Sequence, residues 1–112
     1  MMLRISERHL EKITIFDVSG DIDLASSPQL RKALLRELRE LRMPRVVLNL
    51  KAVRYMDSSG VASLVEGLKA SRDVGSRFIL FGLNTTVRDV LQLSKLLKIF
   101  EISESEEQAV AP

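Results

Sequence analysis

Short apolar runs alternate along this sequence with longer stretches of helical periodicity, and that alternation constrains the fold more than any other feature. Residues 46–50 (VVLNL) form an almost continuous apolar run, which is typical of a strand buried on both faces. Residues 78–81 (FILF) have the same character. Because each run follows an amphipathic stretch, the sequence predicts parallel strands joined by helices, in an α/β domain with right-handed crossovers.

The order of elements predicted along the chain is β-β-α-β-α-β-α-β-α. Alternation with period two at residues 3–6 and 12–19 predicts an N-terminal hairpin. A last short strand is expected at residues 98–102. Residues 1–112 are therefore expected to form one domain, in which about four helices cover a mainly parallel sheet of about five strands.

Several helix ends carry recognisable signals. Ser27 and Pro28 suit the N-cap and the first position of a helix. The inner face of that helix is expected to carry leucines, with arginines and glutamates on the other face. These leucines are Leu30, Leu34, Leu38 and Leu41. Gly75 suits the end of the second helix and Asn84 the start of the third, while residues 103–106 (SESE) have the spacing of a capping box for a fourth.

The composition excludes several classes of protein. The chain is 46% hydrophobic and 29% charged, and no apolar run approaches the ~20 residues of a membrane-spanning helix. It has no cysteine and no secretory signal, which fits a cytoplasmic protein without disulfides. The net charge is +2, with basic residues gathered between positions 31 and 45. No aromatic side chain is interleaved with them, so a solvated helix face is favoured over a nucleic-acid site.

The junction after the strand at residues 46–50 carries two hydroxyls beside a carboxylate, in Asp57, Ser58, Ser59 and Gly60. Backbone N–H groups at the start of a helix lack intrahelical partners, so a phosphate there would meet donors and the positive end of the helix dipole. A phosphate would also add roughly −1.5 to −2 charges beside Asp57. The other interpretation is that the two serines only cap the helix.

Around this junction the chain resembles the STAS family, and specifically the free-standing anti-sigma-factor antagonists of bacteria. The matching segments are residues 19–23 (SGDID), 46–50 (VVLNL), 55–61 (YMDSSGV) and a closing segment at 91–100 (LQLSKLLKIF). The likeness spans nearly the whole chain, and the spacing between the motifs also matches.

The resemblance implies a role for each residue of the motif. Ser58, directly after the aspartate, would be the phosphorylation site, with its hydroxyl oriented by Asp57. Ser59 and Gly60 would shape the surface to which a partner binds. Asp23 matches an acidic position near the same edge of the sheet, although an aspartate in a turn also has an ordinary structural use.

The resemblance further implies a partner-switching cycle. The unphosphorylated antagonist would bind an anti-sigma factor that is also a serine kinase, and so free a sigma factor. Phosphorylation by that kinase would release the antagonist, and a serine phosphatase would reset it. The alternative within the same family is an adaptor subunit, docked on the ATPase of a lipid-transport ABC system or placed in a larger signalling assembly.

Enzymatic and metal chemistry have little support in the sequence. A serine hydrolase would need a base near Ser58, and the single histidine, His9, falls in the predicted hairpin. No Gly-x-Ser-x-Gly motif, phosphate-binding glycine loop or cysteine is present, and the carboxylates show no metal-ligand spacing. We therefore expect a protein that is not an enzyme, with no metal site and no cofactor.

Overall fold

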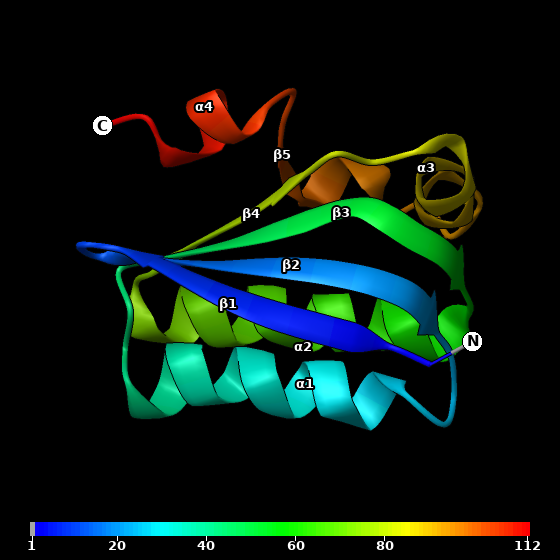
Figure 1. Cartoon of the computed structure of the whole chain (residues 1–112), viewed down its shortest axis with the longest axis horizontal. Helices are drawn as coiled ribbons and strands as arrows, with labels where there is room; N and C mark the ends of the chain where they lie inside the picture. The colour runs from blue at the N-terminus through cyan, green and yellow to red at the C-terminus, as the bar shows by residue number, and fades with distance from the viewer. Residues whose placement is uncertain (1) are drawn as a thin grey trace.

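The computed structural model describes residues 2–112 and contains a five-stranded sheet in the order β1-β2-β3-β4-β5 (Figure 1). β1 and β2 form an antiparallel hairpin, and each later strand is parallel to its neighbour. The strands are β1 (Arg4–Leu10), β2 (Ile13–Ile22), β3 (Arg45–Met56), β4 (Arg77–Phe81) and β5 (Glu101–Ser103). The predicted α/β domain, with an N-terminal hairpin and a mainly parallel sheet, is confirmed.

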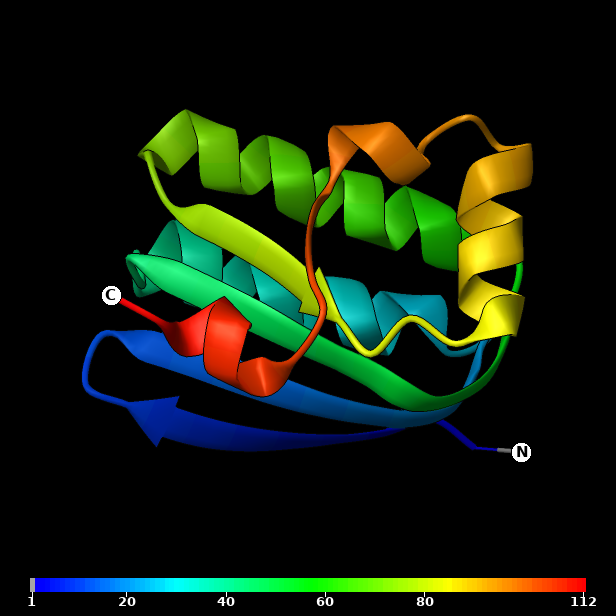
Figure 2. The same ribbon diagram turned by 90° about the horizontal axis from the view of Figure 1, so that it is seen from above.

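Within the described residues, four α-helices and two short helical turns join and follow the strands. They are α1 (Ser27–Leu35), the π-helical turn η1 (Arg36–Glu40), α2 (Ser58–Val74), α3 (Thr85–Leu93), the 3-10 turn η2 (Leu97–Ile99) and α4 (Glu106–Val110). α1 and α2 lie side by side on one face of the sheet, whereas α4 lies on the other (Figure 1, Figure 2). No helix within residues 2–112 is both long enough and apolar enough to cross a lipid bilayer.

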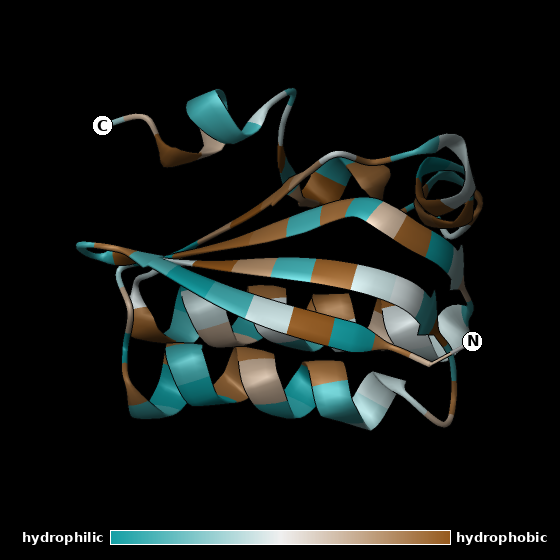
Figure 3. Cartoon of the chain, in the orientation of Figure 1, coloured by the Kyte–Doolittle hydropathy of each residue, from teal (hydrophilic) through white to brown (hydrophobic). Residues whose placement is uncertain are grey.

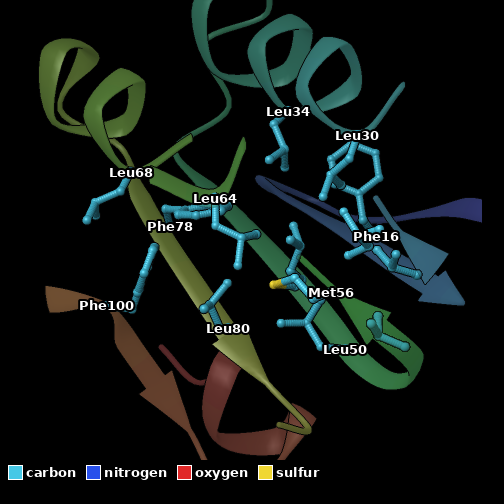
Figure 4. Packing of buried hydrophobic residues seen from close by; sticks show 14 of the residues in the cluster. Phe16, Leu30, Leu34, Leu50, Met56, Leu64, Leu68, Phe78, Leu80 and Phe100 are labelled. Carbon is cyan, nitrogen blue, oxygen red and sulfur yellow. The ribbon is translucent and has the colours of Figure 1, made fainter. Parts of the chain in front are cut away.

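Apolar side chains cover both faces of the central strands, which explains the almost continuous apolar run at residues 46–50. Val46, Leu48 and Leu50 pack in the larger core cluster with α1 and α2. Val47 points to the opposite face, where it packs with Ala109 of α4. Figure 4 shows part of the larger cluster between the helices and the sheet, including Phe16, Leu30, Leu34, Leu64, Phe78 and Leu80.

The outer side of α1 is polar and faces solvent. Figure 3 shows hydrophobic residues along β4 and polar residues over much of α1. Arg31, Lys32 and Arg36 are all exposed, and Arg31 forms an ion pair with Glu66 of α2 (2.5 Å). The buried leucines of the two helices lie on the opposite side, against the sheet.

The π-helical turn η1 changes which side chains face the core. The Leu41 N–H donates to the Arg36 carbonyl (3.0 Å), a wider turn than that of a regular α-helix. Leu41, predicted to be inside, is 51% exposed, whereas Glu37, predicted on the polar face, is 1% exposed. Both predictions were wrong because the 3.6-residue period does not hold through a π turn. The buried Glu37 carboxylate accepts a hydrogen bond from the Thr14 hydroxyl of β2 (2.6 Å).

The start of α1 lies one residue earlier than predicted. Ser26, not Ser27, is the N-cap, so Pro28 is the second helical residue. The Ser26 hydroxyl makes no capping bond, because it instead accepts from the Asp23 N–H (2.9 Å) and donates to the Asp21 carbonyl (2.7 Å) in the preceding loop. By contrast, the predicted glycine C-cap of α2 and asparagine N-cap of α3 are both confirmed.

The last strand and the last helix are also shifted. The strand predicted at residues 98–102 begins later, because η2 precedes it and Phe100 is anchored in the core (6% exposed). Ser103 pairs within the sheet and so cannot cap α4. Ser105 caps this helix instead, and its hydroxyl accepts a hydrogen bond from the Gln108 N–H (3.2 Å).

Candidate functional site

β2 and β3 end side by side at one edge of the sheet, and the two candidate aspartates follow them. Ile22 pairs with Met56 in the last position of the register. The N–H of Asp57 then donates to the Ile22 carbonyl (3.1 Å). The loop that contains Asp23 and the start of α2 therefore meet, as expected at the carboxyl ends of parallel strands.

Asp57 is the N-cap of α2. Its Oδ1 accepts hydrogen bonds from the Ser59 N–H (2.9 Å), the Gly60 N–H (3.2 Å) and the Ser59 hydroxyl (2.5 Å). The Ser59 hydroxyl, the amides of Gly60 and Ser59, and the Leu24 amide lower the pKa of the Asp57 carboxyl below its ordinary value. The carboxylate is therefore ionised at neutral pH, and it lies at the positive end of the helix dipole.

The two serines of the motif have different surroundings. Ser58 is the first residue of α2 and is exposed, and its hydroxyl has no hydrogen-bond partner within residues 2–112. Ser59 is partly buried and donates its hydroxyl to Asp57. The expectation that Asp57 orients the Ser58 hydroxyl was wrong, since the carboxylate orients Ser59 instead. Ser58 therefore presents the accessible hydroxyl.

The donors at the start of α2 are largely occupied. The Ser59 and Gly60 amides bond the Asp57 carboxylate, and the Val61 N–H donates to the Asp57 carbonyl (3.1 Å). A phosphate on Ser58 would therefore lie beside the ionised Asp57 carboxylate, and it would find few free amides to donate hydrogen bonds to it. This differs from the expectation drawn from helix termini in general, because the N-cap side chain already satisfies these donors.

Gly60 is buried, and its missing side chain allows close packing inside the domain. A Cβ atom at this position would lie 2.7 Å from Met56 Cγ and 2.8 Å from Ile22 Cγ2. The glycine lets the first turn of α2 approach β2 and β3. Gly60 itself is buried, so it can shape the predicted partner-binding surface only through the position that it gives to the first turn of α2.

Asp23 stabilises the loop beside the motif. Its Oδ1 accepts hydrogen bonds from the Ala25 N–H (3.1 Å) and the Ser26 N–H (3.0 Å), and it also contacts the Ser26 hydroxyl (3.0 Å). Asp23 thus lies at the predicted edge of the sheet. Its carboxylate makes the hydrogen bonds of an Asx turn, which fixes the path of the loop.

An exposed leucine for which the sequence predicts no role lies in this loop. Leu24 is 78% exposed, and its amide is one of the groups that stabilise the Asp57 carboxylate. Tyr55, near the end of β3, is 50% exposed. In the sequence, the only indication of an exposed apolar side chain here is that Leu24 lies between a predicted strand and a predicted helix. Because the Leu24 amide bonds the carboxylate of Asp57, Leu24 lies close to the start of α2, and we call the exposed residues Leu24 and Ser58 the Ser58 surface.

The single histidine of the chain lies away from this site. His9 pairs with Thr14 beside the hairpin turn, whereas Asp57 and Ser58 follow the opposite end of β3. Ser58 therefore has no imidazole beside it to act as the base of a serine hydrolase.

The chain matches a known protein family over almost its whole length. A sequence profile of the STAS domain matches residues 4–109. The chain belongs to the STAS domain family. The resemblance predicted from the motifs at residues 19–23 and 55–61 is thereby confirmed.

Curated relatives of this STAS domain are named as antagonists of anti-sigma factors. The anti-sigma-B factor antagonist of Listeria monocytogenes is 33% identical over 105 residues, covering 93% of this chain and 90% of the relative. The anti-sigma F factor antagonist of Paenibacillus polymyxa is 28% identical over 110 residues, covering 98% of this chain and 94% of the relative.

Two solved structures share the fold of this chain, at a lower sequence identity than the curated relatives. The unphosphorylated form of the anti-sigma factor antagonist SpoIIAA has a TM-score of 0.81 and 23% identity, covering 96% of this chain and 93% of that chain. The phosphorylated form of SpoIIAA, from Bacillus, has a TM-score of 0.75 and 22% identity, covering 96% of each chain.

The lowered pKa of Asp57 predicts a pH-dependent contribution to stability. A carboxyl whose folded-state pKa is depressed stabilises the fold above its unfolded pKa of about 3.9 and loses this contribution as pH falls through the folded pKa. Asp57→Asn keeps a capping oxygen but does not titrate. We expect the wild type to be more stable than the variant by about 0.3–1 kcal/mol at pH 7, through the helix dipole. Urea unfolding should show the difference closing below about pH 4, and a difference unchanged at pH 2.5 would contradict it.

Proposed function

We propose that this STAS domain is an anti-sigma-factor antagonist whose binding is switched by phosphorylation of Ser58. The observation that carries the proposal is the contrast between an exposed, unbonded Ser58 hydroxyl and a Ser59 hydroxyl fixed by Asp57. The names of the curated relatives support the antagonist role, and the phosphorylated form of SpoIIAA supports the modification.

In the unphosphorylated state, the Ser58 surface offers an apolar anchor beside a neutral hydroxyl. Leu24 is 78% exposed, and its loop is fixed by the turn at Asp23. An exposed apolar side chain on a loop that is already fixed loses little conformational freedom when a partner binds it. We propose that an anti-sigma factor docks here and releases its sigma factor, in the cytoplasm.

Phosphorylation would oppose that docking through charge. The modification adds roughly −1.5 to −2 charges beside Asp57, which is already ionised and already occupies the amides of Ser59 and Gly60. Few donors remain to compensate the phosphate, so burying it in an interface is unfavourable. We propose that the anti-sigma factor is itself the serine kinase and that a serine phosphatase restores the binding form. The domain would act as a regulator and catalyse no reaction.

Phosphate mapping tests the modification site. The purified chain is incubated with a candidate anti-sigma kinase and ATP, and the product is digested and analysed by mass spectrometry. We expect one phosphate, on Ser58, and its loss in Ser58→Ala. The matched variant Ser59→Ala should still be phosphorylated, because it keeps the exposed hydroxyl of Ser58 and removes only the hydroxyl that is bonded to Asp57. Phosphate on Ser59 or on another residue would contradict the proposal.

The adaptor role makes a different prediction. Stable co-purification with a transporter ATPase that is unaffected by Ser58→Ala would favour it.

A further inference from the structure

Three side chains with metal-binding atoms converge at the hairpin end of the sheet. Glu7 and His9 are two residues apart on β1, so their side chains lie on the same face of this edge strand. Glu37 comes from η1, at the end of α1 that lies near the hairpin turn (Figure 1). One imidazole nitrogen or carboxylate oxygen from each of the three residues lies within 4.8 Å of the other two.

One separation within this cluster already has the value expected between two ligands of a zinc-class ion. His9 Nε2 lies 3.4 Å from Glu7 Oε2. Metal–ligand bonds of about 2.1 Å in a tetrahedral site place neighbouring ligand atoms about 3.4 Å apart. Glu7 and His9 are both exposed, so rotation about their side-chain torsions can shorten the remaining separations to Glu37.

The Glu37 carboxylate is buried without a cation beside it. Its residue is 1% exposed, and its hydrogen-bond donor is the neutral Thr14 hydroxyl (2.6 Å). No ion pair of Glu37 is found within residues 2–112. Burying a carboxylate is unfavourable unless a charge compensates it, and a bound cation would do so.

Thr14 links the buried part of the cluster to the exposed part. Its hydroxyl oxygen lies 3.3 Å from His9 Nδ1 and donates to Glu37. With its hydroxyl proton directed to Glu37, the Thr14 oxygen can accept from an Nδ1–H group of His9. His9 Nε2 then carries a lone pair on the side of Glu7. An imidazole whose second nitrogen donates to an outer partner is the usual form of a histidine ligand.

We propose that Glu7, His9 and Glu37 bind one divalent metal ion of the zinc class, through one imidazole nitrogen and two carboxylate oxygens. Imidazole nitrogen and carboxylate oxygen are both ordinary ligand atoms of zinc-class ions. The chain has one histidine and no cysteine, so no other side chain offers an imidazole or a thiolate. The ion would connect edge strand β1 with η1, at the end of the sheet opposite to Ser58, and it is independent of the proposed switch.

Zn²⁺ titration by calorimetry tests the site. The full chain, without an affinity tag and after removal of metals with a chelator, is expected to bind one ion. His9→Ala and Glu37→Gln are each expected to weaken binding by at least about tenfold. Glu11→Gln removes a carboxylate from the same hairpin outside the cluster, and it should leave the affinity unchanged.

A stability measurement gives a second readout. Because an ion that binds only the folded state raises the unfolding midpoint, Zn²⁺ should raise the midpoint of the wild type and not that of His9→Ala. His9 is exposed, so its replacement leaves the core intact. Absence of stoichiometric Zn²⁺ binding, unchanged affinity in His9→Ala, or unchanged affinity in a folded Glu37→Gln variant would each overturn the proposal.

Discussion

Replacing Ser58 with aspartate is expected to weaken binding to the cognate anti-sigma factor by about thirtyfold to several thousandfold, while the domain stays folded. The range corresponds to about 2–5 kcal/mol for leaving a charge unpaired in a buried interface. The Ser58 side chain is exposed and has no hydrogen-bond partner in the described chain, so its replacement removes no internal contact. The new carboxylate would lie next to ionised Asp57, which adds repulsion.

A matched variant separates charge from size. Ser58→Asn introduces a side chain of the same shape as aspartate without the charge, and it should bind within about tenfold of the wild type, a difference of about 1.4 kcal/mol. Calorimetric titration of the anti-sigma factor measures both variants, and circular dichroism checks that each is folded. Equal affinities for Ser58→Asp and Ser58→Asn would show that charge does not control docking.

Gly60→Ala is expected to lower the free energy of unfolding by about 1–3 kcal/mol, the largest stability effect of a single methyl group at the site. The added Cβ would lie 2.7 Å from Met56 Cγ and 3.0 Å from the Ile22 carbonyl oxygen. The backbone oxygen belongs to the last pair of the β2–β3 register and cannot move without disturbing the contact with Asp57. The first turn of α2 must therefore shift, and Ser58 with it.

Gly67 of the same helix provides the control. A Cβ there would lie 3.1 Å from Phe78 Cζ and 3.2 Å from Leu34 Cδ1, which belong to side chains able to yield. Alanine is also favoured over glycine within a helix by roughly 0.5–1 kcal/mol, which offsets the crowding. Urea unfolding should show a much smaller change for Gly67→Ala than for Gly60→Ala. Equal changes would contradict the packing role assigned to Gly60.

The sheet and the helices could be predicted because their signals are local. The run at residues 46–50 is apolar on both faces, and it does form a strand with Leu48 on one side and Val47 on the other. Gly75 adopts the left-handed conformation that ends α2 (φ 73°), and Asn84 caps α3. Each of these features depends on residues that are close in sequence, so the pattern alone determines it.

The errors arose where contacts between distant segments decide the structure. Glu37 is buried because a π turn rotates it toward Thr14, and no periodicity analysis with 3.6 residues per turn can detect that. The same turn brings Glu37 to His9, so the metal-ligand set proposed above has no recognisable spacing in the sequence. Ser103 illustrates the point again, because pairing with β4 overrides its capping-box spacing.

Within the motif, the sequence distinguished the two serines only through family resemblance. Helix-terminus chemistry alone suits Ser59 almost as well as Ser58. The structure adds a physical distinction, since Asp57 fixes the Ser59 hydroxyl and leaves that of Ser58 exposed. Leu24 could not be foreseen because its exposure depends on the loop that Asp23 shapes.

The proposed switch is tested most directly by comparing two forms of the same chain, unmodified and phosphorylated on Ser58, for binding to one anti-sigma factor. Calorimetric titration gives the affinity of each form, and phosphatase treatment of the second form provides the internal control. We expect the phosphorylated form to bind at least about thirtyfold more weakly, corresponding to about 2 kcal/mol, and dephosphorylation to restore the affinity. Equal affinities for the two forms would contradict the switch.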